Sequence, residues 1–175
     1  MKENGQIVEK VWKVGGMYSA AIEKIVEWLQ KAVTVAENDQ QKKALQLLIE
    51  YFQTGDLKKF DEYSIAWVAD TNSRLDVENG FIEVYADPIG KKATYESIVS
   101  LKDMEATKRI KAIADQAQWF EDNSPIQRKY RKEKVKGVAA KVINIAMLGG
   151  DCYPASPLGI NLPNADGIRK DIGSQ

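Results

Sequence analysis

Residues 79–90 read Asn79-Gly-Phe-Ile-Glu-Val-Tyr-Ala-Asp-Pro-Ile-Gly90, and this stretch marks where the hydrophobic pattern of the chain changes from helical to extended. Side chains alternate in character from Ser73 to Ala86, which predicts a strand. The following Asp87-Pro-Ile-Gly90 is typical of a turn. Residues 94–101 alternate again, so we expect a second strand after the turn.

The first predicted strand carries a carboxylate among apolar neighbours. Strict alternation puts Glu83 on one face with Leu75, Val77, Phe81 and Tyr85. A carboxylate between aromatic side chains is costly to bury unless a cation or a hydrogen-bond donor meets it. A peptide amine or an arginine would meet that demand, and an edge strand that leaves Glu83 in water is the alternative.

Helical periodicity surrounds these strands on both sides. Apolar residues recur at helical spacing in five segments: 7–36, 39–55, 56–68, 106–120 and 135–146. We expect Gly15-Gly16 to kink or split the first of them, and Gly149-Gly150 to end the last. From Asp151 onward, prolines and glycines indicate loops. The pattern predicts an α+β fold that is predominantly helical, with a small group of strands around residues 73–101.

These segments divide the chain into four predicted parts. They are a helical N-terminal part (1–70), a strand region (71–102), a helical pair (103–150) and a loop with a tail (151–175).

Composition excludes several classes of function. Lys+Arg and Asp+Glu number 25 each, so net charge does not favour nucleic acid or an anionic membrane as a partner. The chain has no histidine, which excludes Ser/His and Cys/His nucleophiles and histidine-based zinc sites. Cys152 is the only cysteine, so no internal disulfide forms. No signal peptide and no membrane-spanning run are present, and we expect a cytoplasmic protein.

A second polar segment, Gly159-Ile-Asn-Leu-Pro-Asn164, lies in the predicted loop. Pro163 favours an extended conformation at Leu162, so the loop is stiff and presents Asn161 and Asn164. Each amide both donates and accepts hydrogen bonds, which suits an extended peptide with a free ammonium. The alternative is that both asparagines form only local turns around the proline.

Taken together, these segments resemble the dipeptidyl peptidase III family. The resemblance rests on the Asn79 to Gly90 stretch and the Asn-x-x-Asn loop, and also on three shorter segments: Ile65-Ala-Trp-Val-Ala-Asp70, Ser73-Arg-Leu-Asp76 and Tyr95-Glu-Ser97. It covers about Asp61 to Gln175 and is closest to the bacterial, Bacteroides-type branch. The family comprises zinc-dependent exopeptidases that remove dipeptides from peptide N-termini. By the same resemblance, residues 104–144 would be helices of the zinc-bearing upper lobe.

The resemblance implies roles for six residues. Glu83 and Tyr85 match the Glu-x-Tyr pair that holds the N-terminal end of the substrate. Asn161 and Asn164 match the asparagines that bind its ammonium and first backbone groups. Two further residues, Glu96 and Arg169, match residues that line the substrate cleft. Glu78 departs from the pattern, because an apolar residue is usual there.

The zinc motif of the family, His-Glu-x-x-x-His, does not occur in this sequence. We therefore expect the chain alone to bind no zinc and to be inactive, zinc belonging to the full-length family enzyme. The partners implied are a peptide substrate, the remainder of a peptidase chain and a second copy through self-association. The alternatives are a stand-alone helical interaction or scaffold protein, and a homologue that binds peptides without cleaving them.

Overall fold

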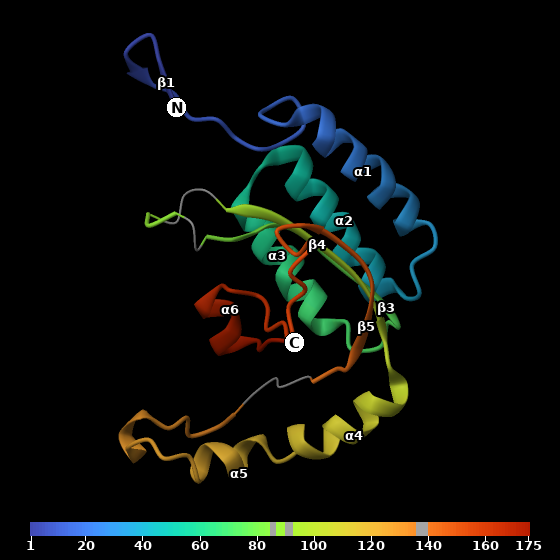
Figure 1. Cartoon of the computed structure of the whole chain (residues 1–175), viewed down its shortest axis with the longest axis vertical. Helices are drawn as coiled ribbons and strands as arrows, with labels where there is room; N and C mark the ends of the chain where they lie inside the picture. The colour runs from blue at the N-terminus through green and yellow to red at the C-terminus, as the bar shows by residue number, and fades with distance from the viewer. Residues whose placement is uncertain (85–86, 90–92, 136–139) are drawn as a thin grey trace. The chain divides into compact units, whose positions relative to one another are not determined.

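The structure, a computed structural model, describes residues 1–84, 87–89, 93–135 and 140–175. It divides the chain into two units, Met1–Asp70 and Thr71–Gln175. The first unit is built mainly from helices and the second contains a three-stranded sheet, so the predicted α+β class is confirmed (Figure 1).

The first unit is a group of three helices. They are α1 (Ser19–Val33), α2 (Asp39–Thr54) and α3 (Leu57–Ala69), and α2 packs against the other two (Figure 1). Leu48 and Phe52 of α2 and Ile22 of α1 are at most 1% exposed. Burying large apolar side chains contributes about 1.5–3 kcal/mol each, so α2 supplies the centre of this core.

Local sequence signals set the ends of these helices. The side chain of Asn38 accepts a hydrogen bond from the backbone N–H of Gln41 and caps α2. Gly55 ends α2 with a φ of 71°, a conformation that glycine adopts at little cost. Asp56 then caps α3 through the backbone N–H of Lys58.

The prediction of a helix from residue 7 was wrong for residues 7–18. The chain begins with a hairpin of β1 (Lys2–Glu3) and β2 (Gln6–Ile7), and the helix starts only at Ser19. Gly15 and Tyr18 have φ angles of 74° and 61°, which a right-handed helix excludes. Upstream of Ser19 the chain therefore forms a hairpin and a loop, and not a helix.

The second unit is organised around an antiparallel sheet of order β3-β4-β5 (Figure 1). Its strands are β3 (Leu75–Glu83), β4 (Thr94–Lys102) and β5 (Ile143–Gly150). The helices α4 (Met104–Ala114) and α5 (Ala117–Asp122) and the 3₁₀ turn η1 (Arg128–Tyr130) follow β4. A one-and-a-half-turn helix, α6 (Asp166–Asp171), lies near the C-terminus.

The prediction of a helical pair over residues 103–150 was wrong in its second half. Residues 143–150 form strand β5, and residues 136–139 of the predicted helix lie outside the described residues. The apolar residues of this segment fit the helical period, but they also fit the strand period of two, through Ile143, Ile145 and Met147. Residues 142, 143 and 145 are β-branched, which favours a strand. Pairing with the edge of β4 decides in favour of the strand.

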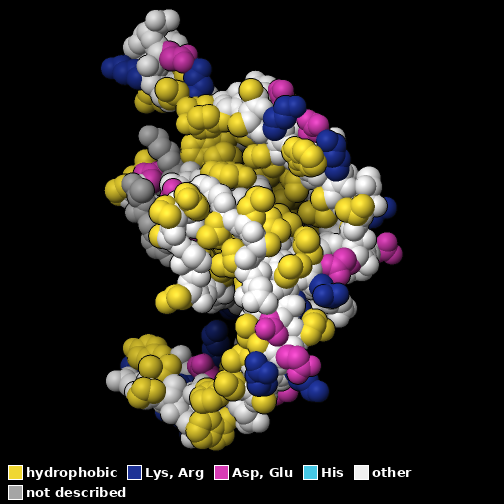
Figure 2. Space-filling view, turned by 45° about the vertical axis from the view of Figure 1, so that its right-hand side comes forward, with side chains coloured by type: hydrophobic (Ala, Val, Ile, Leu, Met, Phe, Trp, Pro, Cys, Tyr) yellow, Lys and Arg dark blue, Asp and Glu magenta, His cyan; other side chains and the backbone are white. Residues whose placement is uncertain are grey.

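Helices α4 and α5 have no buried residue. Six large apolar residues from this region are at least 45% exposed: Met104, Ile113, Trp119, Phe120, Ile126 and Tyr130. Figure 2 shows the yellow side chains that gather over this segment, in the lower part of the view. Extended apolar surfaces of this kind are typical of interaction sites. None of the helices in the described ranges has the length and apolar character needed to span a bilayer.

Candidate functional site

The site lies in the second unit, on one face of its sheet. A pocket of about 590 Å³ is bounded there by β3 and β4 and by the segment 151–169. Its size is within the range of small-molecule and short-peptide sites. Five of the six residues implied by the family resemblance are in or beside it, so residues more than 80 positions apart come together.

A β-bulge brings Glu83 into the pocket. The register of β3 and β4 shifts between Phe81 and Glu83, which pair with Tyr95 and Thr94 respectively, so Ile82 is the extra residue. Because directly paired residues share a face, Glu83 moves to the face of Thr94 and Glu96. The predicted face, shared with Phe81, was therefore wrong.

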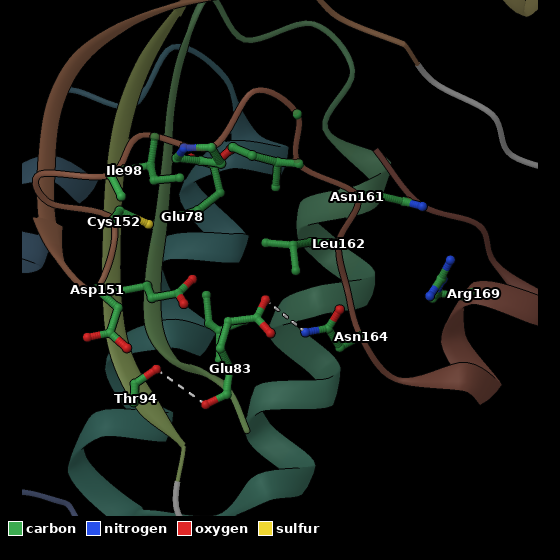
Figure 3. Close-up of a pocket in the computed structure, with 16 residues that line it drawn as sticks. Glu78, Glu83, Thr94, Ile98, Asp151, Cys152, Asn161, Leu162, Asn164 and Arg169 are labelled. Atoms are coloured by element: carbon green, nitrogen blue, oxygen red, sulfur yellow. Dashed lines mark hydrogen bonds between the residues drawn. The ribbon is translucent and has the colours of Figure 1, made fainter. Parts of the chain in front are cut away.

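The bulge is held by a hydrogen bond from the Thr94 hydroxyl to the carbonyl oxygen of Glu83, 3.3 Å long (Figure 3). On the opposite face, Phe81 packs edge-on against Tyr95 with ring centroids 5.7 Å apart. Both contacts oppose a slip of the register, and a slip would return Glu83 to the other face.

The asparagine loop meets Glu83 directly. The side-chain amide of Asn164 donates a hydrogen bond to Oε1 of Glu83 over 3.2 Å (Figure 3). Two backbone hydrogen bonds of 3.1 Å between Leu162 and Gln175 close the loop. Pro163 is buried, which further holds the loop in place.

Asn161 lies differently from Asn164. In Figure 3 Leu162 points into the pocket, whereas Asn161 points to the other side of the loop, where Arg169 of α6 lies. Both Asn161 and Arg169 still line the pocket. Tyr85, the remaining residue implied by the resemblance, lies outside the described residues.

Glu96 and Cys152 form a polar pair in the pocket. The Cys152 thiol, 6% exposed, donates a hydrogen bond to the Glu96 carboxylate. Burial, followed by the charges of Glu83 and Asp151, raises the pKa of Glu96. Burial, followed by the charge of Glu96, raises the pKa of Cys152, so the thiol is protonated at neutral pH.

Gly150 directs Asp151 and Cys152 toward the pocket. It has a φ of 61°, and the backbone of Tyr95 occupies the space where a Cβ would lie. The backbone N–H of Asp151 then bonds the Tyr95 carbonyl oxygen over 3.0 Å. Only glycine meets both conditions at this turn away from β5.

Sequence reasoning missed Glu78 as a residue of the site. This carboxyl group is 6% exposed, lines the pocket, and has no hydrogen-bond partner for Oε2 among the described residues. Burial is the main cause that raises its pKa to about 7, and the charge of Asp76 adds to it. The alternation of the strand could have pointed to it. Glu78 lies on the same face as Gly80 and Ile82, and the bulge at Ile82 brings Glu83 onto that face.

The pocket is predominantly acidic. Its described lining residues include Glu78, Glu83, Glu96 and Asp151, against the single basic residue Arg169. Such a site favours a ligand with a positive charge or with hydrogen-bond donors. The described residues hold no group of three or more His, Cys, Asp or Glu placed to bind a metal ion, so they do not fit the zinc that the resemblance implies.

Comparisons with known proteins show what the chain as a whole is similar to. Nudix hydrolase 3 of Arabidopsis thaliana is 33% identical over 159 residues, which are 90% of this chain and 20% of that protein. Dipeptidyl peptidase 3 of Rattus norvegicus is 27% identical over 158 residues, 90% of this chain and 21% of that protein. The chain thus spans about a fifth of the length of these curated relatives.

The fold has a close counterpart among solved structures. The structure of DPP III from Caldithrix abyssi matches with a TM-score of 0.85 and 26% identity, over 99% of this chain and 33% of that one. The model of peptidase family M49 matches residues 2–175. The resemblance predicted from the sequence is therefore confirmed at the level of the family: this chain belongs to peptidase family M49.

Proposed function

We propose that the second unit binds the free N-terminus of a peptide, as the part of a dipeptidyl peptidase III-type exopeptidase that recognises the substrate. The observation that carries this proposal is the contact between Glu83 and Asn164, 81 residues apart, inside an acidic pocket. A carboxylate beside an amide offers what an ammonium group requires, namely a countercharge and oriented acceptors.

The geometry of the pair supports this role. Nδ2 of Asn164 donates to Oε1 of Glu83, and this hydrogen bond does not use Oδ1 of the amide or Oε2 of the carboxylate as acceptors. An ammonium has three donors, which acceptors of this kind can receive. An N-acetylated peptide has neither the charge nor these donors, which is the basis for selecting free N-termini.

Peptide hydrolysis is assigned in this proposal to residues outside the chain. The described residues do not fit zinc, and the chain has no histidine to complete such a site. The remainder of a longer peptidase is the proposed partner of the exposed α4–α5 surface, with self-association of the isolated chain as a consequence. A cytoplasmic location remains part of the proposal.

Calorimetric titration with a pentapeptide of alanine tests the binding role. We expect binding of the free peptide and none of its N-acetylated form. Glu83→Gln should weaken binding by on the order of 2 kcal/mol, about thirtyfold in Kd, because the ammonium loses its countercharge. Glu105→Gln, which changes an exposed carboxylate of α4, is the matched control and should leave Kd unchanged.

Two outcomes would contradict the proposal. Equal affinity for the free and the acetylated peptide would show that the ammonium is not recognised. A Kd that does not change in Glu83→Gln, with folding confirmed by circular dichroism, would make Glu83 a scaffold residue, as the helical scaffold alternative requires.

A further inference from the structure

Glu78 is the part of the pocket that recognition of the N-terminus leaves unexplained. Figure 3 shows Glu78 beside Ile98 and Cys152, at the opposite end of the pocket from Glu83 and Thr94. Glu78 pairs with Ile98 and Glu83 pairs with Thr94, so the two glutamates are four residues of β4 apart, which corresponds to roughly 13 Å along the strand. An ammonium held at Glu83 therefore does not reach Glu78.

The carboxyl group of Glu78 has an unmet hydrogen-bonding demand. Oε2 is fully buried and has no partner among the described residues, although the side chain lines the pocket. A buried polar atom without a partner costs about 1–3 kcal/mol, so native structures rarely keep one unless a ligand or water completes it.

We propose that Glu78 is a specificity-determining residue, at which the pocket binds a peptide side chain that carries a hydroxyl or a primary amide. The proposal rests on the proposed function, since it assumes a peptide with its N-terminus at Glu83. It extends that function by adding a second recognition point about four residues along the peptide.

The chemistry of the group selects this class of side chain. Burial raises the pKa of Glu78 to about 7, so both its protonated and its ionised form are populated near neutral pH. A hydroxyl or a primary amide both donates and accepts, and it can pair with Oε2 in either form. A cation would have to leave water to reach this end, past the more accessible carboxylates of Glu83 and Glu96.

Charged neighbours do not replace such a ligand group. Lys141, which lowers the pKa of Glu78, donates its hydrogen bond to Asp76 over 2.7 Å. Cys152 donates to Glu96. On the apolar side, Ile98 pairs directly with Glu78 across β3 and β4 and has no polar atom to offer. The backbone N–H of Glu78 itself bonds to the carboxyl group, and the neighbouring side chains are engaged elsewhere or apolar, so Oε2 has no partner among the described residues.

Pentapeptides with a free N-terminus and an amidated C-terminus test the inference. Starting from five alanines, each position in turn carries Asn or Leu, which have similar size but differ in hydrogen bonding. At one position we expect the wild-type chain to bind the Asn peptide about tenfold tighter than the Leu peptide, as one buried hydrogen bond predicts. Glu78→Leu should abolish or invert this ratio, whereas Glu78→Gln should retain a preference for Asn.

The two proposals fail in different ways. Glu83→Gln should weaken both peptides of a pair equally and leave their ratio near ten. If the wild type shows no Asn preference at any position while the Glu83 and acetylation effects hold, the inference is overturned and the proposed function stands. A preference that Glu78→Leu leaves intact also overturns it. If no free peptide binds the wild type, the proposed function falls, and the inference with it.

Discussion

The buried carboxyl group of Glu78 makes a quantitative prediction about stability and pH. Its pKa is raised from 4.5 to about 7 in the folded chain, and burial is the main cause. A group that binds its proton more tightly in the folded state stabilises the fold when protonated and loses that contribution as pH rises. The free energy of unfolding should therefore decrease between about pH 4.5 and pH 7, and level off above.

The size of the decrease follows from the shift. Each pKa unit corresponds to about 1.4 kcal/mol, so a change from 4.5 to about 7 predicts a loss of about 3 kcal/mol at pH 8 relative to pH 4. Glu78→Gln has no titrating group at this position and should lack this component. Glu105→Gln, on the exposed face of α4, should keep the wild-type dependence.

Hydrogen exchange is the suitable assay, because it reports on the second unit alone. Protection factors of the β3 and β4 amides, corrected for the intrinsic exchange rate at each pH, give the opening free energy of the strands that hold Glu78. We compare the wild type with Glu78→Gln from pH 5 to pH 8. The same pH dependence in both proteins would refute the reasoning, since it would show that Glu78 has an ordinary pKa.

Two further predictions concern the turn beside the pocket and metal binding. Gly150→Ala should destabilise the second unit by about 1–3 kcal/mol in urea unfolding, because Gly150 has a positive φ and the Tyr95 backbone lies where the new Cβ would be. Gly149→Ala is the control and should cost less, because its new Cβ would make only an ordinary contact with Ser97. Equal losses of stability in the two variants would contradict this prediction. The second prediction is that the chain, expressed without a histidine tag and dialysed, contains far less than one zinc ion per molecule by mass spectrometry. The reason is that it has no histidine and only one cysteine. Stoichiometric zinc would contradict this prediction.

Much of the candidate site could be found from residue types together with the family resemblance. Glu83, Glu96, Asn161, Asn164 and Arg169 were selected from the sequence and its family resemblance, and all five line one pocket. For Glu83 and the two asparagines the chemistry is local information, because an isolated carboxylate or a proline-stiffened amide pair can be recognised without coordinates. Glu96 and Arg169 were selected from the resemblance alone. The roles of these residues remain proposals that the titrations test.

The helices of the first unit were also determined by local signals. Apolar spacing placed the core of α2, and Gly55 with Asp56 marked the end of one helix and the cap of the next. These features involve residues within one or two helical turns of each other, so a sequence window contains all the interactions that decide them.

Only the tertiary structure decided which carboxylate is buried and which face Glu83 occupies. Strand pairing is non-local: the bulge at Ile82 appears only when β3 is aligned with β4, and segment 143–150 becomes a strand only because β4 offers it an edge. One residue of bulge reverses the face of every side chain after it. The sequence thus indicated five of the groups in the site, and the pairing of the strands determined that Glu78 and Glu83 share it.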